Sequence, residues 1–152
     1  MKKLLLLLLF IPLVSFGQTI VGDFKINNGE IIWQKIYNDS LKIESQDLIL
    51  KPIGLPFNTT IYLKQVSNAK LIVDHKNGRT RLTVKNIYAI DDASYTIYGV
   101  TTNPDKPTYA HEIYVKNRKG VFSSKFLKKD GKLLNDIIER EIKSLTTKDD
   151  DW

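Results

Sequence analysis

The sequence predicts an α+β fold, in which an antiparallel sheet is covered on one face by a C-terminal helix. Two observations predict this fold. Segment 79–90 alternates apolar and polar residues directly after an Asn-Gly pair, which is typical of a hairpin in a sheet with one buried face. Segment 132–145 places its apolar residues on one stripe at helical spacing. Each of the two apolar surfaces needs a partner, and each can supply it to the other.

The first 17 residues are predicted to be a cleaved export signal. Two lysines precede the apolar run 4–14, and Ser15-Phe16-Gly17 places small residues where a signal peptidase cleaves. The run is shorter than the roughly 20 residues that cross a bilayer. The chain holds no cysteine that could carry a lipoprotein anchor. We therefore expect a periplasmic or secreted protein that begins at Gln18, with no transmembrane anchor after signal cleavage.

Length and charge limit what the mature part can be. Removing 17 of the 152 residues leaves 135, which suits one domain over residues 18–146 followed by an acidic tail over 147–152. The net charge of +6 falls to +4 without the two lysines of the signal, which is not a nucleic-acid signature. The absence of cysteine excludes a disulfide framework, thiolate metal sites and a cysteine nucleophile.

The central hairpin has a predictable register. A two-residue turn at Asn77-Gly78 pairs His75 with Thr80, and each later pair follows in step as far as Leu71 with Val84. On the second arm one face is expected to be apolar and the other polar. The apolar set is Leu82, Val84, Tyr88 and Ile90, and the polar set is Arg81, Thr83 and Lys85.

Four other segments rich in β-branched or aromatic residues are predicted to be strands: Ile31–Tyr37, Thr60–Val66, Tyr95–Val100 and Glu112–Val115. Residues 40–54 leave two alternatives open, a short helix capped by Ser40 or an extended stretch that ends before Pro52.

The C-terminal helix is predicted over Lys132–Leu145. Its start is open, because it could begin near Ser124, with Asp130-Gly131 as an interruption, or at Asp130-Gly131 itself. The apolar stripe consists of Leu134, Ile137, Ile138, Ile142 and Leu145. We expect this stripe to cover the hairpin residues Leu82 and Val84. The tail beyond it is expected to be mobile up to Trp152.

Three stretches carry a resemblance to a known family. They are "GEIIWQKIYN" (29–38), "NGRTRLTVKNI" (77–87) and "DDDW" (149–152). They resemble stretches of a family of small exported bacterial domains of unknown function, described as having a TBP-like fold. The resemblance implies a curved antiparallel sheet with helices on one face, and it implies no known reaction. The chain departs from the family at Lys51-Pro52-Ile53-Gly54, where the first helix of the family would run.

The chain offers few groups for catalysis. His75 and His111 are its only histidines, and two histidines without a companion nucleophile make a poor catalytic set. His111-Glu112 is expected to lead into a strand, and it lacks the second histidine of a zinc protease motif. The acidic runs 91–92 and 149–151 do not have the spacing of a calcium loop. We predict no catalytic residue, no metal site and no cofactor.

The polar face of the sheet is the better candidate for binding. Arg81, Thr83 and Lys85 would offer cations and a hydroxyl group, and the strand 31–37 could add an aromatic side chain beside them. Each side of that strand carries both apolar and polar residues, so alternation does not show which side is buried. Trp33 is therefore either part of the core or exposed as a platform for a ligand. The candidate ligand-binding residues are Trp33, Lys35, Tyr37, Arg81, Thr83 and Lys85.

A basic run offers a second candidate surface. Between Lys116 and Lys132 the basic residues face only one acid, Asp130, and the run reads either as a solvated face or as a surface for a lipid headgroup or acidic protein. Its basic residues are Lys116, Arg118, Lys119, Lys125, Lys128, Lys129 and Lys132. We predict an exported, non-enzymatic binding or accessory domain. Its partner would be an envelope protein or an anionic envelope component, and not nucleic acid. The alternatives are a structural envelope protein without a small ligand and a hydrolase using His75 or His111.

Overall fold

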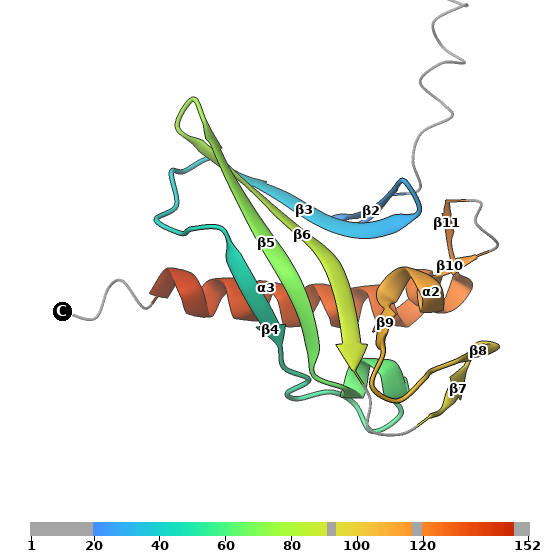
Figure 1. Ribbon diagram of the computed structural model, residues 1–152. Coiled ribbons are helices and arrows are strands. Elements are labelled where there is room, and N and C mark those ends of the chain that lie inside the picture. The colour runs from blue at the N-terminus through green and yellow to red at the C-terminus, as the bar shows by residue number, and fades with distance from the viewer. Residues whose placement is uncertain (1–19, 91–93, 117–119, 148–152) are drawn as a thin grey trace, which may run out of the picture.

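The structure is a computed structural model that describes residues 20–90, 94–116 and 120–147. The predicted signal 1–17, the acidic run 91–92, Arg118, Lys119 and the acidic residues of the tail lie outside the described residues. The α+β fold class is confirmed, because an antiparallel sheet curves across one long C-terminal helix (Figure 1).

The main sheet has seven strands. Six of them follow the order β1-β2-β3-β6-β5-β4, and the seventh, β9, pairs with the last three residues of β6, past the part of β6 that pairs with β3. All of its pairs are antiparallel. Its strands are β1 (Ile20–Val21), β2 (Phe24–Asn27), β3 (Glu30–Tyr37), β4 (Gln46–Leu50), β5 (Ser67–Lys76), β6 (Arg79–Ile90) and β9 (Pro107–Tyr109). Two small hairpins lie outside it, β7 (Thr96–Ile97) with β8 (Val100–Thr101) and β10 (Val115–Lys116) with β11 (Val121–Phe122).

Four helical segments complete the described residues. They are the 3-10 helix η1 (Ile61–Lys64), the short helix α2 (Ala110–Tyr114), the π-helical segment η2 (Phe126–Asp130) and the long helix α3 (Gly131–Thr147). In Figure 1, α3 crosses the sheet on one side only, and the tip of the β5–β6 hairpin extends beyond it. Among the described residues, no long helix lies on the other side of the sheet, which we call the open face.

The predicted hairpin register is confirmed from His75↔Thr80 to Leu71↔Val84. The predicted parity is wrong beyond Lys85. Asn86 has a positive φ of 53°, and a bulge there sets two residues of β6 against Ala69 of β5. The extra residue shifts the alternation by one position, so Ile87 and Ala89 are buried in place of Tyr88 and Ile90.

Three of the other predicted strands need correction. Thr60–Val66 contains η1, and Glu112–Val115 lies mostly in α2, because short apolar runs suit a helical turn as well as a strand. Tyr95–Val100 is interrupted by a tight turn in which Tyr98 and Gly99 have positive φ. The fourth prediction, Ile31–Tyr37, is confirmed by β3. Of the two alternatives for residues 40–54, the extended one is observed in β4, and the described residues include no helix there.

The core lies between the sheet and α3. The helix buries Leu134, Ile137, Ile138 and Ile142 and partly buries Leu145, as its stripe predicts. Leu82 and Val84 of β6 belong to the same buried cluster. Trp33 is also completely buried in it, which settles its place in favour of the core.

The C-terminal helix passes through a π-helical turn before α3. Helical structure begins at Ser124, and the N–H of Gly131 bonds the carbonyl oxygen of Phe126 five residues earlier. Helical structure therefore begins near Ser124, one of the two alternatives, and Asp130-Gly131 marks the change from the π-helical turn to the regular α-helix. A side chain at Gly131 would place its Cβ 2.8 Å from the Phe126 carbonyl oxygen and 3.1 Å from the Phe126 ring. Glycine thus allows this turn to close over Phe126.

Gly131→Ala is expected to lower the free energy of unfolding by about 1 to 3 kcal/mol, because the added methyl group overpacks this turn. This sign is the reverse of the ordinary helix effect, in which alanine is favoured over glycine by about 1 kcal/mol. Urea unfolding of the variant and of a control in the same helix, Lys143→Ala, would measure the difference. A stabilised Gly131→Ala protein would contradict the π-helical turn.

Asp130, the one acid within the basic run, is not on the surface. It is completely buried, where its Oδ2 accepts hydrogen bonds from Thr60 Oγ1 at 2.6 Å and from the Tyr114 hydroxyl at 2.9 Å. Burial and the neighbouring carboxylate raise the pKa of the Tyr114 hydroxyl far above its ordinary value, so the hydroxyl stays protonated as a donor. The carboxylate therefore joins three separate segments, and it does not pair with the surrounding lysines.

Candidate functional site

The structure divides the six candidate residues between the two faces of the sheet. Trp33, Lys35 and Tyr37 pair across β6 with Val84, Leu82 and Thr80, on the face that α3 covers. Arg81, Thr83 and Lys85 alternate with those partners, on the open face. The expected combination of an aromatic platform with these cations is therefore not formed.

On the covered face, the three residues of β3 are engaged with the helix or the core. The Trp33 indole Nε1 donates a hydrogen bond to Asn135 Oδ1 at 2.8 Å. The Lys35 ammonium donates to Glu139 Oε1 at 2.6 Å, and this hydrogen bond raises the pKa of the Lys35 amine. Partial burial raises the pKa of the Tyr37 hydroxyl. These groups attach the sheet to α3.

On the open face, β3 contributes Gln34 and Ile36 beside the cations of β6. Gln34 links its neighbours, because it accepts from Lys25 Nζ at 2.8 Å and donates to Thr83 Oγ1 at 2.9 Å. Ile36 lies opposite Arg81 and is 60% exposed. Thr83 is thus already bonded within the sheet, whereas the surface around Ile36 and Arg81 is open.

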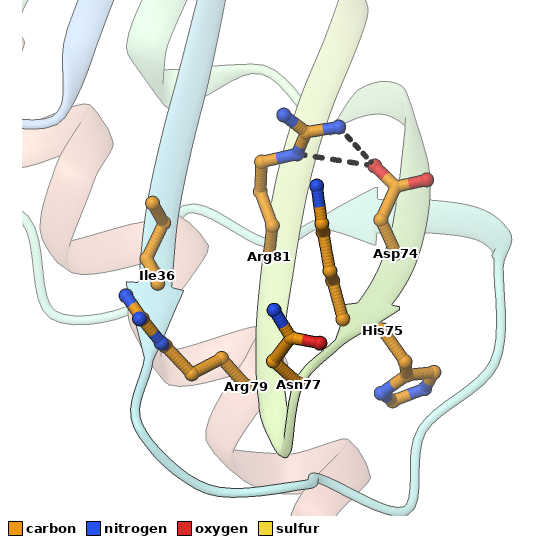
Figure 2. Close-up of a pocket in the computed structure, with 7 residues that line it drawn as sticks. Ile36, Asp74, His75, Asn77, Arg79 and Arg81 are labelled. Carbon is orange, nitrogen blue, oxygen red and sulfur yellow. Dashed lines mark hydrogen bonds and ion pairs between the residues drawn. The ribbon is translucent and has the colours of Figure 1, made fainter.

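A hollow of about 550 Å³ lies on this face at the tip of the β5–β6 hairpin. Arg81 donates from Nε and Nη2 to Asp74 Oδ2 at 3.2 and 3.0 Å, so this cation is neutralised (Figure 2). Lys76 and Arg79 also line the hollow, and among the residues that the structure describes no carboxylate forms an ion pair with either. The hollow therefore has an excess of positive charge beside the apolar side chain of Ile36.

Two pairs of cations oppose one another across β5 and β6. Lys76 is the direct partner of Arg79, and Lys70 is the direct partner of Lys85. Both pairs lie on the open face, in phase with Asp74 and Arg81. Like charges directly opposite each other on antiparallel strands are destabilising. An anion bound between them would relieve that repulsion.

Lys70, Lys76 and Arg79 were not among the residues that the sequence singled out. The signal was present for all three, because the Asn77-Gly78 turn that pairs His75 with Thr80 also pairs Lys76 with Arg79. The same register pairs Lys70 with Lys85 one step beyond Leu71 with Val84, and the bulge begins only after that pair.

The two histidines lie at different ends of the sheet. His75 is exposed at the hairpin tip, where its Nδ1 is 3.2 Å from Thr80 Oγ1. His111 lies in α2, which corrects the expectation of a strand there, and its ring stacks on Tyr109 with centroids 5.5 Å apart. Tyr109 pairs with Tyr88 near the far end of β6. The fold therefore does not bring the two imidazoles together.

A second hollow, of about 910 Å³, lies beside α2 and contains His111 with two carboxylates. Both carboxylates already bond the backbone, because Glu30 accepts from the N–H of Asn86 and Glu112 from that of Tyr109, each at 2.7 Å. Within the described ranges, no group of three or more histidine, aspartate or glutamate side chains is placed to hold a metal ion.

Comparisons of the chain with protein-family models, with curated proteins and with solved structures find no match. The resemblance to exported domains with a TBP-like fold therefore stays a prediction from the sequence. Among the helices that the structure describes, none is long and apolar enough to cross a membrane.

Proposed function

We propose that the chain is an exported, non-enzymatic binding module of the cell envelope, and that the open face of its sheet binds an anionic partner. The observation that carries this proposal is the pair of opposed cations at the hairpin tip, Lys76 with Arg79. Such an arrangement costs stability in the free protein. A carboxylate or phosphate placed between the two cations would turn the repulsion into charge-assisted hydrogen bonds.

The surroundings of these cations suit a macromolecular partner. Ile36 adds an exposed apolar side chain in the hollow, and Lys85 continues the row of cations along β6 on the same face, whereas Lys70 lies directly opposite Asp47 of β4. Protein interfaces commonly combine a few apolar contacts with complementary charge. The expected export signal argues against nucleic acid as the partner. An acidic protein segment of the envelope fits the charge and the apolar contact together.

Charge reversal at the hairpin tip tests the proposal. Lys76→Glu combined with Arg79→Glu is expected to lower the capture of an envelope partner by at least about ten-fold, because attraction is replaced by repulsion. The measurement is cross-linking in envelope extracts followed by quantitative recovery of the enriched partner. The matched control reverses two other exposed lysines, Lys106→Glu with Lys143→Glu, and should capture the partner normally. Equal losses in both proteins would contradict a specific site at the tip.

The same assay separates the two rival functions. A hydrolase that uses its histidines should lose its phenotype when His75 and His111 are both changed to alanine. The binding module should retain capture and phenotype when His111 alone is changed, because His75 lines the hollow itself. A purely structural envelope protein should enrich no partner, even with Lys76 and Arg79 intact. Melting temperatures of all variants would establish that each protein is folded.

A further inference from the structure

The connection between β4 and η1 presents large apolar side chains to solvent. Phe57 is 97% exposed, Ile53 is 61% exposed and Ile61, at the start of η1, is 49% exposed. Single exposed apolar residues are ordinary in folded proteins. Here Phe57 is almost wholly exposed, and an exposed isoleucine lies four residues away on each side of it. Together the three side chains form a larger apolar surface than single exposed residues usually do.

The backbone of this connection is held by side chains from three elements. The Arg140 guanidinium of α3 donates to the carbonyl oxygens of Lys51 and Ile53, the latter at 2.8 Å. Lys64 of η1 donates to the Phe57 carbonyl at 2.8 Å, and Lys129 of η2 donates to the Asn58 carbonyl at 3.0 Å. The exposure of Phe57 and Ile53 is therefore a property of an anchored loop.

Basic side chains surround these apolar groups. The Lys64 ammonium lies 5.4 Å from the centre of the Phe57 ring. Next to the loop, Thr60 bonds the Tyr98 hydroxyl, and the Lys125 ammonium lies 5.9 Å from the Tyr98 ring. The acid closest in sequence to Lys125 and Lys129, Asp130, is buried and engaged with Thr60 and Tyr114. We call this surface the loop patch; it consists of Ile53, Phe57, Ile61, Tyr98, Lys64, Lys125 and Lys129.

We propose that the loop patch docks on an anionic lipid bilayer. Apolar side chains that enter the acyl boundary, beside lysines that stay among anionic headgroups, are the combination that holds proteins at a membrane surface. An exposed tyrosine such as Tyr98 suits the headgroup level, because its ring is apolar and its hydroxyl is polar. The positive charge of the patch complements the negative charge of the headgroups. Its three exposed apolar side chains would enter the acyl layer beneath the headgroups.

The loop patch is separate from the hollow at the hairpin tip. The strand β5 begins next to η1 and ends at the tip, and its 10 residues span roughly 33 Å. Figure 1 shows η1 and the β7–β8 hairpin at one end of the sheet and the tip of the β5–β6 hairpin at the other. Docking through the patch would leave the basic hollow at the far end of the sheet from the membrane, so each proposal can be tested without the other.

A fluorescent reporter at position 57 tests insertion directly. The chain has no cysteine, so Phe57→Cys creates a single site at which the full protein can be labelled with an environment-sensitive dye. With phosphatidylcholine vesicles that contain phosphatidylglycerol, we expect a blue shift and a rise in intensity. The control Ile36→Cys, at an exposed residue of β3 that lines the hollow, should keep its aqueous spectrum. An unchanged spectrum at position 57 would overturn the proposal.

Vesicle partitioning of unlabelled variants tests the two contributions separately, with the same N-terminus in every protein. Phe57→Ser is expected to weaken partitioning by at least about ten-fold, and Ile36→Ser should not change it. Each lysine near an anionic surface contributes about five-fold. Lys64→Gln with Lys125→Gln should therefore weaken partitioning by roughly 25-fold, and Lys76→Gln with Arg79→Gln should leave it unchanged. Equal partitioning of wild type and Phe57→Ser would overturn the proposal, as would strong binding to pure phosphatidylcholine that is independent of the lysines.

Discussion

Trp33→Ala is expected to lower the free energy of unfolding by about 3 to 5 kcal/mol, the range found for large aromatic side chains removed from a core. The side chain is completely buried between β3 and α3, so alanine would leave a large cavity at the centre of the cluster. It would also leave the Asn135 amide without its indole partner. This loss is a large part of the roughly 5 to 15 kcal/mol that stabilises a typical domain.

Chemical denaturation with tryptophan-independent detection, such as far-ultraviolet circular dichroism, would measure this change. Asn135→Ala separates the two causes, because the indole remains in the core and only its hydrogen bond to Asn135 is lost. The control is Lys35→Ala, two residues along the same strand, whose half-exposed ion pair with Glu139 contributes at most about 1 kcal/mol. A Trp33→Ala protein as stable as Lys35→Ala would place the indole outside the core.

Ile138→Ala is expected to lower the free energy of unfolding by about 2 to 5 kcal/mol, because the side chain is completely buried against the sheet. Lys143→Ala, on the exposed side of the same helix, should change it by less than about 0.5 kcal/mol. Thermal unfolding of the two variants would show a clear separation of melting temperatures. Similar melting temperatures would mean that α3 does not cover the sheet.

Local patterns predicted the elements whose periodicity or turn chemistry is complete. Asn77-Gly78 predicted the central hairpin and its register, and the apolar stripe predicted α3. Asn28-Gly29 carries the same signature, and both residues have positive φ in the turn that joins β2 to β3. This hairpin was not predicted from the sequence. The bulge at Asn86 had a weaker signal, because Asn86 is polar where an apolar residue is expected and Ile87 is apolar where a polar one is expected.

The candidate site was predicted in part. The open face does carry Arg81, Thr83 and Lys85, because strict alternation holds from the turn to Lys85. Trp33 could not be placed, since both sides of its strand are mixed and its hydrogen-bond partner lies 102 residues away. Long-range partners of this kind decide burial, and no pattern within one strand contains them. The Phe57 loop was missed for a related reason, because its exposure depends on anchors from α3 and η2.

The pairing of β3 with β6, which joins two hairpins into one sheet, has a consequence for how the chain folds. The β2–β3 and β5–β6 hairpins can each form early, because two-residue turns close them with little loss of chain entropy. The β3–β6 seam and the Trp33–Asn135 contact join segments far apart in sequence, so their closure should limit the rate. Mutations in the seam would then slow folding, whereas mutations in β4 at the sheet edge would chiefly speed unfolding.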